Sequence, residues 1–276
     1  MRTLFVLISS LSLSIVWAGE ARTTASNGEP QLLRARSTEK ASTVKRLAYI
    51  APDQPHVLPY VVDGENSYTT FYLTNLETYP ILVSCEFVGQ DGYSKSFKFD
   101  IGEGDITTTD LPVNAIGTFR TMGEPEKQQI GWAYCSSKPR TDRFMVYAVL
   151  RSKTGDVTRD INIPLHPDRE TKFSLPYLRA GEAKSNLILI NTDLDLTATF
   201  RVTLFDLNGT NLGAATQTLQ PGEQRISLLD DVFPDFKADL GLVTVEKIDG
   251  TDWVTGSMLT FGPSGPVSFQ GATAIN

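Results

Sequence analysis

The latter part of the chain repeats the pattern of the part before it, and no other feature constrains the fold as strongly. The segment HVLPY at 56–60 recurs as FSLPY at 173–177, and FYLTN at 71–75 recurs as LILIN at 187–191. Three later positions match at a constant offset of 110 residues: Gly131, Asp142 and Gly155 correspond to Gly241, Asp252 and Gly265. We therefore predict two copies of a module of about 100 residues, a period too long for a short-repeat solenoid.

Both copies carry the residue pattern of β-strands. Val83, Cys85 and Phe87 alternate with the side chains between them, and residues 199–205 show the same period of two. The only good helix candidate, 228–233, is cut short by a proline at 234. Long helical periodicity is missing from the rest of the sequence.

Turn residues separate these strands. Asp91-Gly92 and Asn208-Gly209 provide the positive φ angles that tight hairpin turns require. Short strands with turn signals every eight to twelve residues or so are typical of β-sandwiches. The predicted fold class is all-β, with two tandem antiparallel β-sandwich modules of immunoglobulin-like type. We call residues 51–168 module 1 and residues 169–276 module 2.

Residues 1–18 have the organisation of a secretory signal peptide. Arg2 precedes the apolar run 4–16, and Val16-Trp17-Ala18 forms a cleavage site before Gly19. The run is shorter than the about 20 residues that cross a bilayer, so a retained membrane anchor is the weaker interpretation. We expect an exported protein that is secreted, periplasmic or on the cell surface, with no transmembrane segment in the mature chain.

The leader that follows, residues 19–50, differs in charge from the rest. It holds six Lys and Arg against three Glu, a net charge of +3, whereas residues 51–276 hold 18 against 29, a net of −11. Its Ser, Thr, Ala and Gly content predicts a flexible segment that is dispensable for folding. Docking of this segment to an anionic cell surface is the less favoured alternative.

The chemistry-bearing residues argue against an enzyme. The net charge of −7 excludes a general nucleic-acid binder with a basic footprint. The sequence contains no HExxH, Gly-x-Ser-x-Gly or P-loop motif, and its two histidines are His56 and His166. Gly102-Glu-Gly104 lacks the strand-helix context of a nucleotide site and is interpreted as a loop. We predict no catalytic residues, no cofactor and no metal site.

Acidic residues offer two weaker candidates. Asp230, Asp231 and Asp235 lie within one short helix or turn, where a pair of acids about 5 to 10 Å apart would suit glycoside hydrolysis. Two pairs could provide calcium ligands: Asp105 with Asp110, and Asp193 with Asp195. The favoured interpretation of all these acids is that they accept hydrogen bonds from backbone N–H groups at turns and helix starts.

Aromatic residues are the other route to function in an extracellular sandwich, because exposed rings stack on sugars and anchor partners. The candidates for ligand stacking are Trp132, Tyr134, Tyr147 and Trp253. Trp132 neighbours the core-like Ala133 and is expected on the opposite face, and the counterpart of Trp253 in module 1 is Arg143. The alternative, which we favour, is that these rings cover a sandwich edge or the interface between the modules.

The order of these motifs resembles the tandem immunoglobulin-like β-sandwich modules found in secreted proteins of environmental bacteria. The resemblance rests on the Leu-Pro-Tyr segments, the strand ending in Asn, the Asn-Gly hairpin, the LQPGE turn at 219–223 and the closing segment 258–266. It covers about residues 56–273 and implies the architecture, with almost no information on activity. Module 1 departs from the pattern, with 101–109 in place of the Pro-Gly-Glu turn.

The two cysteines complete the sequence argument, because the repeat provides an internal control. Aligned through the hairpin turn, at an offset of 117, Cys85 corresponds to Val202, and at the offset of 110 Cys135 corresponds to Val245. Both valines lie at apolar positions of alternating strands and are expected to face the core. We therefore predict a Cys85–Cys135 disulfide across the first sandwich, like the inter-sheet bridge of immunoglobulin domains. Buried free thiols are the alternative.

Taken together, these features predict a non-catalytic protein with a binding, adhesion or structural role at the cell exterior. Its expected partners are an extracellular polysaccharide or a surface protein. A carbohydrate-active hydrolase, or the accessory carbohydrate-binding domain of one, is the alternative. A third hypothesis is a module that joins an assembly through an unpaired sheet edge. The short linker 164–172 predicts modules that meet over a modest interface and fold separately.

Overall fold

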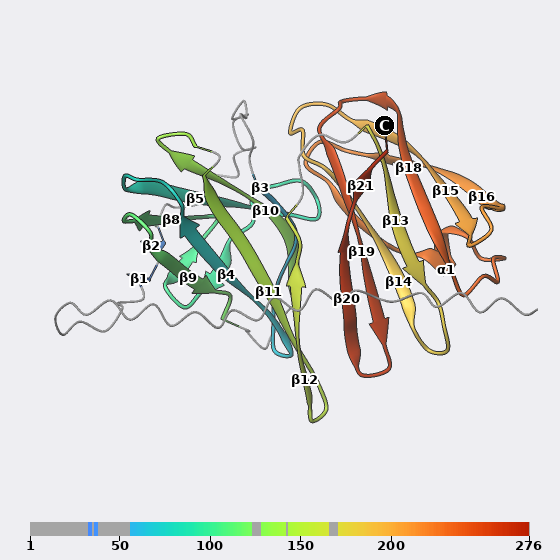
Figure 1. Ribbon diagram of the computed structural model, residues 1–276, viewed down its shortest axis with the longest axis horizontal. Coiled ribbons are helices and arrows are strands. Elements are labelled where there is room, and N and C mark those ends of the chain that lie inside the picture. Colours follow the sequence, from blue (N-terminus) through green and yellow to red (C-terminus); the bar gives the residue numbers. More distant parts are fainter. Residues whose placement is uncertain are drawn as a thin grey trace, which may run out of the picture. The chain divides into compact units, whose positions relative to one another are not determined.

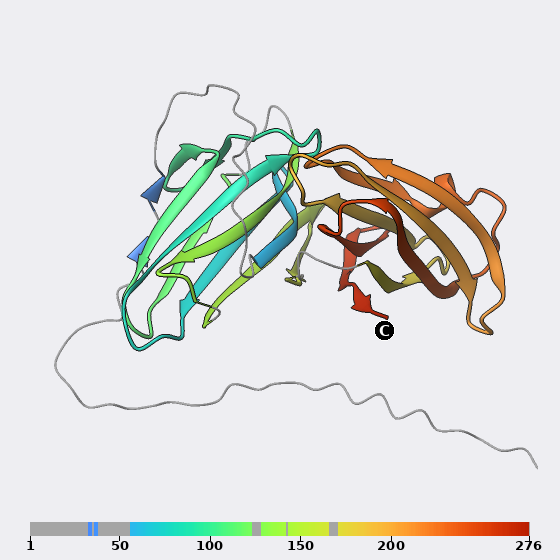
Figure 2. The same ribbon diagram turned by 90° about the horizontal axis from the view of Figure 1, so that it is seen from above.

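A computed structural model describes residues 56–122, 128–141, 143–165 and 171–275, together with the backbone of 33–34 and 36–37 (Figure 1). The predicted signal peptide, most of the leader, Asp142 and His166 lie outside these ranges. The described chain is nearly all β, with antiparallel pairing throughout except at one short strand, which confirms the predicted fold class. In Figure 2 the strands of residues 56–163 and those from residue 172 onward form two groups, which the colours separate.

Module 1 consists of two packed layers. Sheet A has the order β8 (Ile106–Leu111), β5 (Ile81–Gly89), β10 (Gln129–Lys138) and β3 (His56–Gly64). Sheet B has the order β9 (Ile116–Arg120), β4 (Ser67–Asn75), β11 (Phe144–Thr154) and β12 (Val157–Ile163). At one end β3 pairs with β4, so the two layers are joined into one continuous sheet. Aromatic rings from both layers fill the space between them, as where Phe71 of sheet B meets Phe87 of sheet A edge-on at 5.7 Å.

Module 2 repeats this strand order. Its sheet A is β16 (Asn211–Leu219), β15 (Ala198–Asp206), β18 (Leu240–Gly250) and β13 (Lys172–Leu178), with β21 (Thr273–Ala274) added at the edge. Its sheet B is β17 (Gln224–Leu228), β14 (Lys184–Asn191), β19 (Val254–Gly262) and β20 (Gly265–Gly271). The predicted short helix is α1 (Leu229–Val232), which follows β17. The equal strand order supports an internal duplication, which stays a prediction.

Two glycines show that the modules correspond residue by residue. A Cβ atom on Gly131 of β10 would lie 2.1 Å from the carbonyl oxygen of Val88. On Gly241 of β18 it would lie 2.0 Å from that of Phe205. The residue pairs follow from the offsets of 110 and 117 read from the sequence. The same close backbone approach therefore requires glycine at both positions.

One part of the predicted correspondence is wrong. Residues 101–109 do not replace the Pro-Gly-Glu turn of module 2. They form β7 (Gly102–Gly104), which pairs with β6 (Phe97–Phe99), and then most of β8. The turn equivalent to 220–223 is 112–115, because in each the fourth N–H donates to the first carbonyl, at 3.1 Å. Asn114 has a φ of 57° at the position where Gly222 has a φ of 71°. Asparagine adopts this left-handed conformation more readily than most other residues, so the turn of module 1 does not need a glycine.

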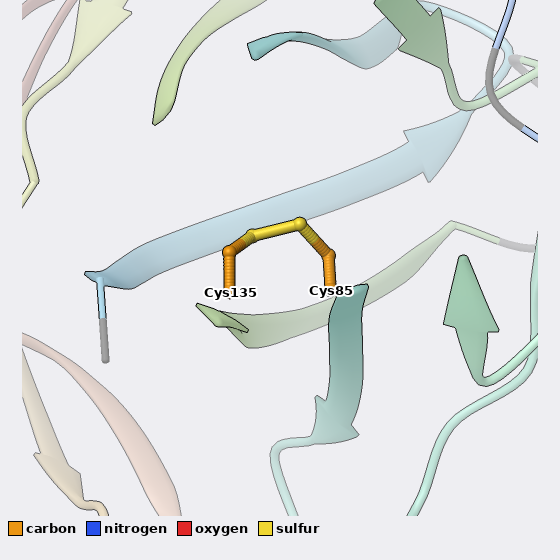
Figure 3. The surroundings of a disulfide bond; sticks show 2 residues. All are labelled: Cys85 and Cys135. Carbon is orange, nitrogen blue, oxygen red and sulfur yellow. A yellow bond between two sulfur atoms is a disulfide. The ribbon is translucent and has the colours of Figure 1, made fainter. Parts of the chain in front are cut away.

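The disulfide between Cys85 and Cys135 is present, but it does not join the two sheets (Figure 3). The cysteines are direct partners on β5 and β10, adjacent strands of sheet A, with Cα atoms 4.0 Å apart. The expected inter-sheet bridge is therefore wrong in its geometry. Val202 and Val245 are likewise direct partners on β15 and β18, so the alignment that predicted the pairing is confirmed.

The leader is not wholly without regular structure. Strand β1 (Leu33–Arg34) pairs in parallel with β9, and β2 (Arg36–Ser37) pairs antiparallel with β8. Both partners are edge strands, whose outer N–H and C=O groups otherwise have no strand to bond. The expectation of an unstructured leader is therefore wrong for these four residues.

The interface between the modules is hydrophobic and continuous with the core of module 1. Strand β14 is buried on both faces: Leu187 and Leu189 pack into the core of module 2, whereas Ile188 and Ile190 join the core cluster of module 1. A strand with both faces buried loses the polar alternation of a solvated sheet. Within the described ranges, no helix has the length and apolarity that a membrane span requires.

Candidate functional site

Trp132 is an anchor between the modules and not a ligand platform. It lies on the opposite face of β10 from Ala133, as predicted, but module 2 covers that face and leaves the ring 1% exposed. Its indole Nε1 donates a hydrogen bond of 3.0 Å to the carbonyl oxygen of Gly222. The ligand-stacking role is therefore wrong for Trp132, and the alternative of a ring at the interface between the modules holds.

Tyr134 is also engaged within the protein. Its hydroxyl donates a 2.5 Å hydrogen bond to Oε2 of Glu86, its direct partner on β5. Burial raises the pKa of both groups, and the negative charge of Glu86 adds to the rise in the pKa of Tyr134. Because the half-buried ring packs against the core cluster of module 1, it is not available as a stacking platform.

Tyr147 is accessible on the outer face of sheet B in module 1. Its side chain is 42% exposed and its ring stacks on that of Tyr72, its direct partner on β4, with centroids 4.9 Å apart. The two rings form a flat surface without a cavity. This residue remains a candidate for contact with a partner.

Trp253 lines a shallow hollow of about 470 Å³ at one end of module 2. The loops that follow β14 and β18 form its walls. The lining residues are Asp193, Asp195, Leu196, Lys247, Gly250, Thr251, Asp252 and Trp253. The hollow thus brings a sequence-predicted aromatic ring beside several charged side chains.

Buried hydrogen bonds hold the floor of this hollow. The side-chain Nδ2 of Asn191, at the end of β14, donates to the carbonyl oxygens of Leu196 and Gln220 at 2.7 and 3.0 Å. Its Oδ1 accepts from the backbone N–H of Asp193. Asp193 in turn accepts from two backbone N–H groups through Oδ1 and from the hydroxyl of Thr251, at 2.8 Å, through Oδ2. The loops are thereby fixed in place before any ligand arrives.

Module 1 has the same network, with one difference. Asn75 makes the equivalent bonds at the end of β4, and Glu77 takes the position of Asp193 and accepts from the hydroxyl of Thr141. Here Arg143 occupies the position of Trp253, and its Nη1 lies 3.8 Å from Oε2 of Glu77. Arg143 thus forms an ion pair with the Glu77 carboxylate at the same end of module 1. In module 2 a neutral aromatic ring stands at this position and borders the hollow.

The charges at the rim are partly neutralised. The Nζ of Lys247 forms an ion pair with Asp252 and also donates to the carbonyl oxygen of Gly250 at 3.2 Å. Asp195 is exposed, and its backbone N–H is bonded to Asp193. The hollow therefore presents an indole ring, two carboxylates and one ammonium group, which together can stack on and hydrogen-bond a polyhydroxylated ligand.

The acidic candidates for calcium or hydrolysis do not converge. Both carboxylate oxygens of Asp193 accept hydrogen bonds from the loop residues around it. Asp105 and Asp110 are five residues apart along an extended segment, a distance of roughly 17 Å. Asp230 pairs with Arg179 at 3.0 Å, and Asp231 and Asp235 are exposed. No group of three or more His, Cys, Asp or Glu residues suited to a metal occurs in the described part of the chain. His56 is buried against Phe144, and desolvation lowers its pKa.

Sequence reasoning singled out Trp253, Asp193 and Asp195 separately but did not bring them together, and it missed Thr251, Lys247 and Leu196. Thr251 had a usable signal, because Thr141 lies exactly one offset of 110 residues before it. Lys247 and Leu196 had none, since they enter the hollow only when two loops far apart in sequence meet. No known family model, no curated protein and no solved structure matches this chain.

Proposed function

We propose that the protein is an exported, non-catalytic binding protein, and that its ligand is a saccharide of an extracellular polymer held in the Trp253 hollow. The observation that carries the proposal is the contrast between the modules. In module 1, Arg143 forms an ion pair with Glu77 of the loop network. In module 2, Trp253 takes the place of this arginine and lines an open hollow.

The chemistry of the hollow supports a sugar ligand. The apolar face of a pyranose ring stacks on an indole, and its hydroxyls bond to carboxylates and ammonium groups. Asp195 and Asp252 offer acceptors, and Lys247 offers a donor. Because hydrogen bonds already fix the loops, little conformational entropy is lost when a ligand binds. A ligand with a small contact area can therefore still bind with useful affinity. An adhesive or structural role at the cell exterior follows from this binding.

A glycan and surface-polymer binding array on the purified protein tests the proposal. We expect binding to at least one polysaccharide, and loss of that binding in Trp253→Ala. Trp253→Arg copies the residue of module 1 and is expected to abolish binding as well. Tyr93→Ala removes an aromatic ring of module 1 that is 43% exposed and far from the hollow in sequence, and it serves as the control.

Two results would contradict the proposal. Absence of binding to every polymer on the array removes the ligand class, and binding that survives both Trp253 variants removes the site. Release of new reducing ends from a bound glycan would replace the binding role by the carbohydrate-active hydrolase considered from the sequence.

A further inference from the structure

The contact between the two modules joins unlike surfaces. Module 1 offers the outer face of its sheet A, where Trp132 and Val88 lie buried. Module 2 offers the outer face of its sheet B, through Ile188, Ile190 and Leu259. Because both modules have the same strand order, each also possesses the type of face that the other uses. Because the contact joins two unlike faces, one face of each type stays free: the outer face of sheet A in module 2 and the outer face of sheet B in module 1.

The free outer face of sheet A belongs to module 2. It carries apolar side chains at the strand positions that form the interface in module 1. In module 1 Trp132 of β10 is the direct partner of Val88 of β5, and on its other side β3 passes it at an irregularity in register that contains Pro59. The equivalent row across β13, β18 and β15 joins three apolar side chains as direct partners: Pro176, Leu242 and Phe205.

Solvent exposure separates these two rows. Trp132 is 1% exposed, whereas Leu242 at the same position is 45% exposed. The next pair along, Leu178 and Leu240, is also exposed and directly paired. We call Pro176, Leu178, Phe205, Leu240 and Leu242 the leucine patch. Its three leucines are 37 to 45% exposed, and Pro176 and Phe205 lie partly buried beside them. Exposed apolar side chains that adjoin on one sheet face are typical of an interaction surface.

The free sheet B face belongs to module 1. Tyr72 of β4 takes the position of the buried Ile188, and Val149 of β11 takes that of the buried Leu259. The same outer face carries Tyr147, Met145 and Ile116, the last two 54% and 51% exposed. We call these five residues, Tyr72, Met145, Tyr147, Val149 and Ile116, the tyrosine face. Its aromatic and methionine content is that of the centre of a protein interface.

We propose that the protein self-associates head to tail, with the leucine patch of one copy docked on the tyrosine face of the next. The occupant is a second copy of this chain because the two free surfaces correspond, position by position, to the two surfaces that already bind each other inside the chain. A contact of this unlike-face kind does not close on itself as a two-fold dimer, so it extends into a ring or an open filament. This inference is independent of the sugar-binding proposal.

Sedimentation velocity over a concentration series tests the association. We expect the mass of the purified protein to rise with concentration beyond that of a dimer. Leu242→Lys and Tyr147→Lys each place a charge in one of the two surfaces and are expected to weaken association at least about tenfold. Ile248→Lys is the matched control, because Ile248 lies on the same strand as Leu242 and is equally exposed, at 45%. Circular dichroism of all three variants reports whether each is folded.

A mixture of the two variants tests the head-to-tail geometry. Leu242→Lys keeps an intact tyrosine face and Tyr147→Lys keeps an intact leucine patch, so a one-to-one mixture retains a single good interface. We expect it to form heterodimers and nothing larger. A monomeric wild-type protein at every concentration overturns the proposal, as does a folded Leu242→Lys or Tyr147→Lys variant that associates like Ile248→Lys. A mixture that stays monomeric overturns the head-to-tail arrangement.

Discussion

Replacing Cys85 and Cys135 together by valine gives module 1 the same buried cross-strand pair that module 2 carries as Val202 and Val245. Valine fills the core at a similar volume, so the exchange removes the covalent link while it leaves little cavity. The double valine variant therefore isolates the contribution of the link itself, which an exchange to alanine would not.

The magnitude follows from the loop that the disulfide closes. The two cysteines are separated by 50 residues, for which the chain-entropy model gives a stabilisation of roughly 4 kcal/mol. This is an upper figure, since residual structure in the unfolded chain reduces the entropy that the link removes. We expect the free energy of unfolding of the double valine variant to fall by about 2 to 4 kcal/mol. Reduction of the wild-type protein is expected to lower it by a similar amount.

The reciprocal exchange provides the control. Val202→Cys with Val245→Cys places a pair at the same register in module 2, with 245 minus 202, or 43, residues between them, and should oxidise and stabilise by up to about 4 kcal/mol. Urea unfolding followed by circular dichroism gives the free energies, and intact mass with and without reductant reports each bond. If the double valine variant unfolds at the same urea concentration as the oxidised protein with an unchanged slope, the loop-closure reasoning fails. If the new pair stays reduced, the residue correspondence between the modules fails.

Trp132→Ala should destabilise the protein by about 3 to 5 kcal/mol and split its urea transition in two, because the ring anchors module 1 to module 2; a single unshifted transition would argue against the anchor. Gly131→Ala should cost at least about 2 kcal/mol by the same assay, because its Cβ would collide with the carbonyl oxygen of Val88. Burial raises the pKa of Glu86 above its ordinary 4.5, so the folded state binds this proton more tightly than the unfolded chain and stability falls as the pH rises through that window. Glutamine has no proton to lose, so the stability of Glu86→Gln relative to wild type should increase from pH 4 to pH 7. A difference in unfolding free energy that is the same at both pH values would refute this. The fragment 172–276 should aggregate, as its exposed β14 face predicts, and a monodisperse folded fragment would restore the hypothesis of independent modules.

Alternation along the strands was sufficient to predict the all-β class, the proline at 234 to limit α1 to a short helix, and the internal repeat to predict the pairing of Cys85 with Cys135. These features depend on residues that are close in sequence, or on two copies of one pattern that constrain each other. The same local signals place Trp132 on the face opposite Ala133, as observed. They do not say what covers that face, because the covering turn lies about 90 residues away in the chain.

Only the tertiary structure decided which of the four candidate aromatic rings meet solvent, and where the disulfide lies. Module 2 docks over Trp132, whereas two loops form a hollow beside Trp253. The cysteines proved to be neighbours within one sheet because strand order, which no local pattern encodes, places β10 beside β5. Burial and proximity depend on contacts between residues far apart in the chain, and those contacts form only when the sheets pack.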